Sequence, residues 1–459
     1  MKIPPVKGTR DFYPPDMARR NWIIDGWKRV SLRNGFEEYD GPIFEYLKMF
    51  QIKSGDEIVE QLFSLKDRGG RDLALRPEIT PTLARMVNQQ INSLPRPIKW
   101  FSVPRLFRAE RPQKGRLREF FQWNVDIIGE ESVLADAEVI FCALDYLQEV
   151  GLTPDDIVVK ISSRKMLAAI LQTIGISQGE LEPLYAVLDK RSRVPQEAFE
   201  EMLEKQLPDM AKRQKVLELM NAESIKEIES MFGRQKAFDE LTELMRWLDR
   251  MGVGGYYRFD PGIVRGLAYY TGIVYEIYRR KASPSGDKAS ELRAIGGGGR
   301  YDDLLKQFSA KGHLTVGGPD IPATGFGLGD SVLAILLKEK GLLKPKPQEL
   351  DYFVACVGNI TFDDEEGNVK FRAEDEAVKL TTKLRRLGFK ADFSYKFAGL
   401  GKQLSEASSR NAGKCIIIGE EFKNSQLVVK DMTTGKQKTI EAGKFFAVIG
   451  TPYGELKLP

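Results

Sequence analysis

The sequence predicts an α+β protein with a helical insertion and a smaller C-terminal α/β domain. Strand-like segments gather between residues 60 and 126 and again between 256 and 302. A long Glu-, Lys-, Leu- and Met-rich stretch with helical period separates them, and alternating strands and helices follow a proline-rich linker. A chain of 459 residues is long enough for roughly three domains of usual size.

Composition excludes several classes of function. A hydrophobic content of 42% with 29% charged residues is ordinary for a globular protein. The net charge of +4 is too small for nucleic acid to bind over the whole surface, so a polyanion would have to bind at local basic patches. Three cysteines without CxxC spacing and a single histidine, His313, support neither a disulfide framework nor a zinc site, so we expect no protein-bound metal.

The sequence carries no targeting or membrane signal that we can identify. The first residues lack an apolar stretch, and no run of about 18 apolar residues occurs in the sequence. We therefore expect a cytoplasmic protein with no membrane partner.

The chain opens with a predicted helix, because Ile23, Trp27 and Val30 recur at helical spacing before Gly35, which stands where a helix stop is expected. A strand-like segment at 36–39 then runs into Gly41-Pro42. Proline suits an edge strand or an interface there, although an ordinary loop proline is equally compatible.

Residues 60–76 predict a hairpin around the turn at 67–71. Thr80 as N-cap and Pro81 at the first helical position would begin the next helix. Glu78 would lie at the strand-to-helix corner. A carboxylate there can receive an ammonium group, but an exposed Glu without a role is the common alternative.

A basic hairpin is predicted at residues 105–122. The turn at 112–115 lies between apolar flanks that read as strands, so a sheet would hold the positive charge and aim it at an anion. A plain solvated face remains an equal alternative. The cations are Arg105, Arg108, Arg111, Lys114, Arg116 and Arg118.

The middle of the chain predicts a helix at 132–147, then a strand and a helix within 155–175. The helical stretch at 177–251 would be an insertion that serves either as a clamp for a partner or as a structural spacer. Strand character returns at 256–259 and at 264–276.

Two glycine-rich passages follow, at 294–302 and at 322–331, and the second leads into an apolar helix at 332–337. The first lacks the Lys-Ser/Thr of a P-loop, and the second lacks the last glycine of a dinucleotide fingerprint. Glycines here allow either neighbouring backbones or a flat ligand to approach a sheet closely.

The C-terminal region follows the linker at 344–349. It predicts an α/β unit with a parallel or mixed sheet. The expected strands lie at 352–357, near 389, at 415–418 and at 427–429, and the helices lie at 373–387, ending at Gly388, and from about 400.

Together these motifs resemble the class II aminoacyl-tRNA synthetases, and specifically the histidyl-tRNA synthetase family. Residues 17–43, the Phe-Arg-Ala-Glu strand at 107–110 with its basic loop, and residues 325–337 are similar to the three class II motifs. Arg-Gly-Leu-Ala-Tyr-Tyr-Thr at 265–271, Gly-Gly-Arg-Tyr-Asp at 298–302, Leu-Arg-Pro-Glu at 75–78 and Lys-Gly-Thr-Arg-Asp at 7–11 resemble the histidyl family.

The resemblance implies a class II-type antiparallel sheet in a catalytic domain at residues 1–175 and 252–343, interrupted by a helical insertion at 176–251. A linker at 344–350 would lead to an anticodon-binding-like α/β domain at 351–459. The implied activity is histidine–tRNA ligation, in which ATP activates histidine to histidyl-adenylate before transfer to tRNA(His). ATP, Mg²⁺ and a homodimer through the Pro42 region are implied as well.

The resemblance also implies residue roles. Arg108 and Arg265 would be catalytic, both on the α-phosphate. The implied ATP-binding residues are Arg108, Glu110 and Phe120, to which we add Arg116. Histidine would bind through Glu78, Thr80, Gln122, Asp126, Arg265, Tyr269, Tyr270 and Tyr301. The implied tRNA-binding residues are Arg111 and Gln113.

The chain departs from the family pattern at three positions, of which one is Ala268, where an acidic residue is common in the Arg-Gly-Leu motif. Val332 stands where an arginine usually holds the far end of ATP, so we suggest Arg116 as a substitute, and Asp126 stands where a longer Glu is frequent. Two alternatives follow: a non-catalytic histidine-sensing regulator of ATP phosphoribosyltransferase, or a class II synthetase for another amino acid.

Overall fold

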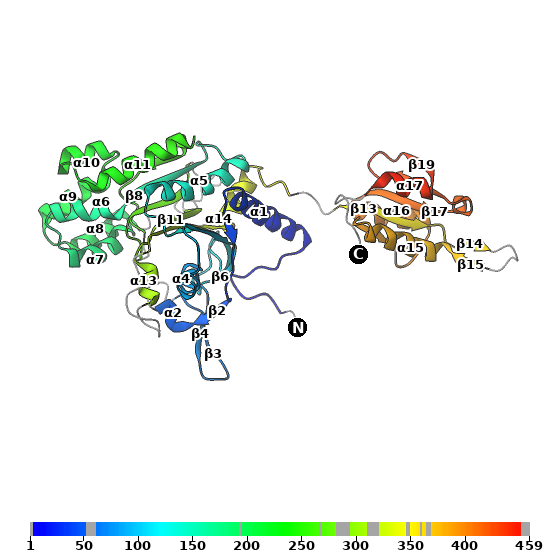
Figure 1. Cartoon of the computed structure of the whole chain (residues 1–459), viewed down its shortest axis with the longest axis horizontal. Helices are drawn as coiled ribbons and strands as arrows, with labels where there is room; N and C mark the ends of the chain where they lie inside the picture. The colour runs from blue at the N-terminus through cyan, green and yellow to red at the C-terminus, as the bar shows by residue number, and fades with distance from the viewer. Residues whose placement is uncertain are drawn as a thin grey trace. The chain divides into compact units, whose positions relative to one another are not determined.

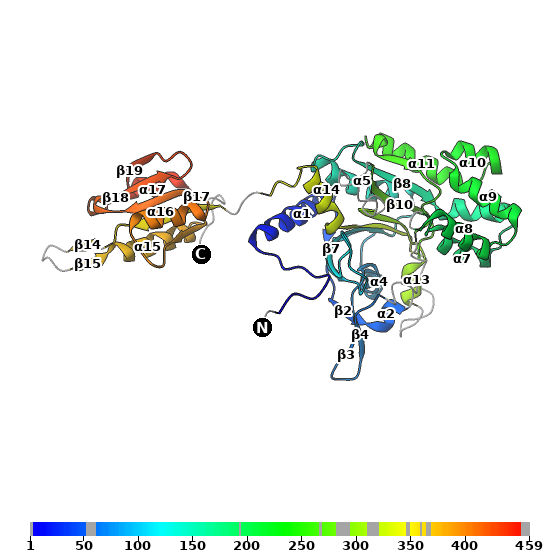
Figure 2. The ribbon, with the colours of Figure 1, turned by 180° about the vertical axis from the view of Figure 1, so that it is seen from behind.

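The chain forms two compact units, Met1–Lys344 and Pro345–Pro459, in a computed structural model (Figures 1 and 2). The structure describes residues 3–51, 61–191, 194–265, 269–280, 294–309, 321–345, 349–358, 360–363 and 369–450. His313 lies outside these ranges. Each unit is described by itself.

The first unit is built around a twisted mixed sheet. Its six inner strands pair antiparallel, whereas β1 and β9 pair parallel at the edges. The α+β fold class is therefore confirmed. In spatial order the strands are β1 (Glu37–Glu38), β5 (Ile98–Ser102), β7 (Glu119–Ile128), β12 (Ala323–Gly329), β11 (Gly296–Arg300), β10 (Ile273–Arg279), β8 (Ile157–Ser163) and β9 (Tyr257–Phe259).

Helices α1 (Pro14–Arg33), α5 (Val133–Glu149) and α14 (Asp330–Glu339) lie on the same side of this sheet (Figure 1). The two faces differ because side chains alternate along a strand. On β7, Trp123 is buried with Trp27 of α1 in a stacked pair 6.0 Å apart. Its indole nitrogen donates to Ser31 Oγ at 2.8 Å. This face is the core, and the even-numbered residues of β7 face the other way.

The predicted basic hairpin is present, because β6 (Arg105–Phe107) pairs antiparallel with β7. Its turn closes through the Gln113–Arg116 bridge, and Gly115 supplies a positive φ of 75°. Some of its charge is neutralised within the hairpin, since Arg105 pairs with Glu119 at 2.6 Å.

A small sheet projects below the central one (Figure 1), formed by β2 (Phe44–Tyr46), β4 (Asp72–Leu75) and β3 (Ser64–Lys66), next to α2 (Leu47–Gln51). The expected 60–76 hairpin is its β3–β4 pair. Pro42 lies in the loop between β1 and β2, so the edge-strand interpretation is wrong.

Helix α4 (Thr80–Gln89) begins one residue earlier than predicted. Ile79 is the N-cap, which places Thr80 first in the helix and Pro81 second. Thr80 is therefore inside the helix and cannot be its N-cap, and it lines the pocket described below.

The helical insertion packs beside the sheet at the β8 side (Figures 1 and 2). Helix α6 (Arg164–Thr173) contacts both α7 and α11. The helices of the insertion are α7 (Gln178–Leu188), α8 (Gln196–Gln206), α9 (Met210–Asn221), α10 (Ile225–Phe232) and α11 (Ala237–Arg250). Buried leucines of α11 join the same core as the sheet.

The predicted strand at 264–276 is wrong in its first half. Strand β10 begins at Ile273, and the described residues before it form turns and irregular structure. Arg265 has φ +58°, a left-handed conformation that no strand residue adopts. The short helix α13 (Leu304–Ser309) follows β11.

The second unit has the mixed sheet that was expected. Strands β16 (Ala391–Phe393), β13 (Leu350–Cys356) and β17 (Ala412–Ile418) are parallel, and β18 (Gln426–Asp431) and β19 (Gln437–Glu441) continue antiparallel. The remaining elements are β14 (Thr361–Asp363), β15 (Val369–Arg372), α15 (Ala373–Arg386), α16 (Leu400–Ser409) and α17 (Ala442–Ile449). Gly388 follows α15 with φ 91°, as its predicted stop role requires.

Candidate active site

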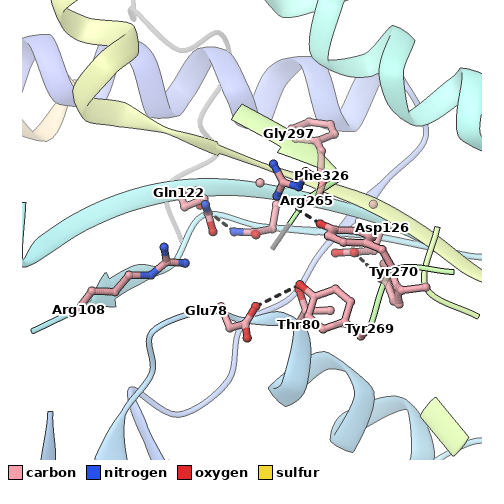
Figure 3. Close-up of a pocket in the computed structure, with 14 residues that line it drawn as sticks. Glu78, Thr80, Arg108, Gln122, Asp126, Arg265, Tyr269, Tyr270, Gly297 and Phe326 are labelled. Carbon is pink, nitrogen blue, oxygen red and sulfur yellow. Dashed lines mark hydrogen bonds between the residues drawn. The ribbon is translucent and has the colours of Figure 1, made fainter. Parts of the chain in front are cut away.

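A pocket opens on the face of the sheet away from α1 and α14, and Figure 3 shows its side chains converging from several elements. Nine residues predicted from the sequence line it together: Glu78, Thr80, Arg108, Gln122, Asp126, Arg265, Tyr269, Tyr270 and Tyr301. They come from β7, α4, the loop between β4 and α4, the residues that directly follow β6 and β11, and the segment before β10, which only the fold brings together.

Asp126 lies at the buried end of the pocket. Its Oδ1 accepts a hydrogen bond from Tyr301 Oη at 2.5 Å. Its Oδ2 is buried and lacks a hydrogen-bond partner among the described residues. Burial raises the pKa of Asp126 to about 7, although the Tyr301 hydrogen bond opposes that rise. The carboxyl group can therefore be neutral or charged near neutral pH, and one oxygen is available to a donor.

Tyr269 and Glu78 form a second polar pair on the opposite wall. The Tyr269 hydroxyl donates to Glu78 Oε2 at 3.2 Å, and Glu78 is only 4% exposed. Burial, followed by the Glu78 charge, raises the pKa of Tyr269 well above its ordinary value, so Tyr269 remains a neutral donor. The corner between β4 and α4 thus presents a carboxylate to the pocket, as predicted.

Arg265 reaches the pocket from the turn before β10. Its Nη1 pairs with Glu276 at 3.0 Å, and its Nη2 donates to Tyr270 Oη at 3.4 Å. Burial lowers the pKa of Arg265, but Tyr270 and Glu276 outweigh it, so the pKa is raised overall. The guanidinium therefore stays positive. The left-handed backbone of Arg265 costs roughly 1–3 kcal/mol, which its surroundings must offset.

Arg108 enters from the end of β6. Its Nε donates to Pro77 O at 3.0 Å, and its guanidinium lies 5.5 Å from the centre of the Phe120 ring. Arg108 and Arg265 thus place two cations at the same pocket (Figure 3).

Glycines make room for these polar groups. A Cβ at Gly325 would collide with Asp126 and one at Gly297 would collide with Arg265, while a Cβ at Gly327 would lie 2.7 Å from Gln122 Cδ. These glycines therefore leave room for pocket side chains, and the approach of a flat ligand stays a prediction. Gly298 serves close packing of β11 on β12, since its Cβ would lie 2.7 Å from Phe326 Cα.

The remaining predicted residues lie outside this pocket. Glu110 is buried and forms an ion pair with Arg116, so the two groups assigned to ATP hold each other instead of facing the pocket. Arg111 and Gln113 are exposed at the hairpin tip. Phe120 lies beside Arg108 without lining the pocket.

Val332 has a packing role on α14. A Cβ at Gly115 would meet Val332 Cγ2 at 3.1 Å and Ile335 Cδ1 at 3.8 Å, so the apolar face of α14 supports the turn of the basic hairpin. A small separate cavity is lined here by Lys114, Gly115, Arg279, Ile295, Val332, Ile335 and Leu336. Arg279 pairs with Glu339 at 2.6 Å.

Sequence reasoning missed two residues that line the pocket, Asn124 and Phe326, as well as Glu276, the ion-pair partner of Arg265, and the individual roles of the glycines. Period-two alternation from Gln122 and Asp126 would have identified Asn124. Glu276 could be found only from the β10–β11 pairing, which sets it opposite Gly297. Phe326 packs edge-to-face on Trp123 at 4.9 Å, so its side chain belongs to the core.

Among the described residues, no group of three His, Cys, Asp or Glu side chains could hold a metal ion. No helix in that part of the chain is long and apolar enough to cross a membrane.

Comparison with known proteins gives the family. A family model described as Histidyl-tRNA synthetase matches residues 8–330, and one described as Anticodon binding domain matches residues 353–451. The chain is 37% identical to the histidine–tRNA ligase of Opitutus terrae, covering 97% of both chains. It is also 37% identical to the chloroplastic/mitochondrial histidine–tRNA ligase of Arabidopsis thaliana, over 95% of this chain and 84% of the relative.

A solved structure supports the fold. The histidyl-tRNA synthetase from Nostoc superposes with a TM-score of 0.74 at 23% identity, covering 97% of this chain and 99% of that one. The same family is indicated by the sequence motifs, by the sheet that carries them and by both matched regions. The chain belongs to the histidyl-tRNA synthetase family.

Proposed function

We propose that this protein is a histidine–tRNA ligase, which forms histidyl-adenylate from histidine and ATP in this pocket and then transfers the histidyl group to tRNA(His). The observation that carries the assignment is Asp126, a buried carboxyl group with one oxygen bound by Tyr301 and the other lacking a partner. An imidazole N–H is a suitable donor to that oxygen.

Histidine would lie with its imidazole between Asp126, Tyr270 and Tyr301. Its ammonium group would face Glu78, Thr80 and Gln122, which also line the pocket. Tyr269 would keep the Glu78 carboxylate oriented through their hydrogen bond. This arrangement recognises both ends of the amino acid and leaves its carboxylate toward the two arginines.

Activation would join the histidine carboxylate to the α-phosphorus of ATP, and pyrophosphate would leave. Arg108 and Arg265 would neutralise the charge that develops on the α-phosphate oxygens. Positioning and fixed cations suffice for such a displacement, so no side-chain nucleophile is required. The free cysteines Cys142, Cys356 and Cys415 are buried in cores and have no part in it.

Phe120 and Glu110 would hold the adenine, and Arg116 would bind the triphosphate end in place of the arginine missing at Val332. The ion pair between Glu110 and Arg116 must open for both roles. Mg²⁺ finds no cluster of protein ligands in the described ranges. A Mg²⁺ ion would arrive with ATP and would supply positive charge to its triphosphate, beside Arg108 and Arg265.

The tRNA would meet Arg111 and Gln113 at the exposed tip of the basic hairpin, and the C-terminal unit would bind the anticodon. We also propose a homodimer in the cytoplasm. The small β2–β4–β3 sheet supports a dimer, because Ile43, Phe44, Tyr46 and Leu65 are each about half exposed and would bury an apolar surface. Light scattering tests this state, and a monomer at micromolar concentration would reject it.

Histidine-dependent exchange of pyrophosphate into ATP tests the activity. We expect exchange with histidine, followed by charging of tRNA(His). Folded protein without exchange would favour the regulatory alternative, which the near full-length match to ligases disfavours. Exchange driven by another amino acid would reject the histidine assignment.

A further inference from the structure

Arg164, the first residue of α6, is buried behind the pocket and holds the turn that carries Arg265. Its Nε donates to Val264 O at 3.2 Å, its Nη1 to Tyr270 O at 3.2 Å and its Nη2 to Arg265 O at 3.0 Å. Only 6% of its side chain is exposed. One guanidinium thus bonds three carbonyl groups on both sides of the catalytic arginine.

The same residue ties β10 to this turn through its backbone. Arg164 N donates to Gly272 O at 2.9 Å, just before β10 begins. Arg265 itself has φ +58°, which a non-glycine residue adopts only where its surroundings impose it. The bonds from Arg164 supply that restraint, because they fix the carbonyl orientation at Val264 and at Arg265.

The helical insertion in turn holds Arg164. Glu182 of α7 accepts from Arg164 Nη1 at 3.1 Å, and the Tyr185 ring lies 4.9 Å from the Arg164 guanidinium. Glu182 is 60% exposed, whereas Tyr185 is buried. The contacts therefore form a continuous path from α7 through Arg164 to the backbone of Arg265.

We propose that Arg164 is a positioning residue for Arg265, and that helix α7 of the insertion supports adenylate formation by keeping Arg164 in place. The insertion is then more than a spacer. This inference rests on the proposed role of Arg265 in the reaction.

A double-mutant cycle with Arg265→Ala tests the path. Arg164→Met should lower kcat for histidine-dependent exchange about tenfold or more and change the histidine Kd much less. In the Arg265→Ala background, Arg164→Met should lower the same kcat by less than about twofold. Arg164→Lys should not restore activity, because an ammonium cannot span three separated carbonyl groups. Additive effects, or full rescue by Lys, would overturn the proposal.

Glu182→Gln provides a second variant at a partly exposed position, should Arg164→Met fail to fold. We expect kcat to fall about two- to fivefold, without further loss in the Arg265→Ala background. Glu240→Gln is the matched control. Glu240 bonds Lys165, the neighbour of Arg164, at 2.9 Å and likewise joins the insertion to α6. Among the residues of the Arg265 turn that the structure describes, none bonds Glu240. Equal effects of the two variants would reject the path.

Hydrogen–deuterium exchange separates this inference from the proposed function. Peptides that contain Val264, Arg265 and Tyr270 should exchange faster in Glu182→Gln and Arg164→Lys than in Glu240→Gln, with or without substrate. Unchanged exchange would reject the positioning role even in an active ligase. Faster exchange in a protein without histidine-dependent activity would support the positioning role of Arg164 and reject the proposed function.

Discussion

Replacing Asp126 with Asn should remove histidine binding and also change how stability depends on pH. The carboxyl group has an ordinary pKa of 3.8 in the unfolded chain and a pKa of about 7 in the folded protein. A group whose folded pKa is raised contributes stability that is complete below the unfolded pKa and is lost as the pH rises through the folded pKa. Between pH 5 and pH 8, this one group should cost the wild type about 2–3 kcal/mol of unfolding free energy.

Asn keeps the shape of the neutral carboxyl group and can still accept from Tyr301, but it does not titrate. Thermal unfolding of the full chain at both pH values measures the difference. Between pH 5 and pH 8, the melting temperature of the N-terminal unit should fall by roughly 3–4 °C more in the wild type than in Asp126→Asn. Calorimetry at pH 7 should show no histidine binding by the variant. Identical pH dependence in both proteins would refute the burial argument, and retained histidine affinity would refute the imidazole assignment.

Three further outcomes are expected. Arg265→Ala should reduce histidine-dependent pyrophosphate exchange at least about 100-fold while the histidine Kd changes less than about tenfold; equal losses measured by kinetics and calorimetry would mean ground-state binding. Gly298→Ala should prevent folding of the N-terminal unit because its Cβ would collide with Gly325 O, whereas Gly179→Ala, with open space around it, should leave the melting temperature unchanged. Arg116→Ala should raise the KM for ATP about tenfold if Arg116 replaces the missing motif-three cation; an unchanged KM in steady-state kinetics would exclude that substitution.

Much of the fold was predictable because its signals are local. The helix with Ile23, Trp27 and Val30, the basic hairpin and the C-terminal α/β unit all follow from periodicity and turn residues. The strand prediction at 264–276 failed at Arg265, because apolar and aromatic residues favour a strand while tertiary contacts impose a left-handed turn. Strand β19 (Gln437–Glu441) was missed because it is largely exposed and its apolar and polar residues do not alternate. Helix α17, which follows it, was missed as well.

The site was predictable as a set of residues and not as a geometry. Family motifs indicated the nine pocket residues together, but the pairing of Arg116 with Glu110 depends on how the hairpin tip folds back. Asp126 has a raised pKa because the fold buries it, although the Tyr301 hydrogen bond opposes the rise, and no local sequence pattern reports that burial. The support of Arg265 by Arg164 joins residues 101 positions apart, beyond the reach of any spacing argument.

The glycine strand β11 limits how this enzyme family member can change its amino-acid specificity. One face of the strand must stay bare for Arg265 at Gly297, and the next residue, Gly298, must stay bare for the neighbouring strand. A side chain at Gly297 or Gly298 would collide with its neighbours, so neither position can supply a new side chain for substrate recognition. If Asp126 and Tyr301 bind the imidazole as proposed, a change of specificity would arise at such positions and not at the glycines of β11.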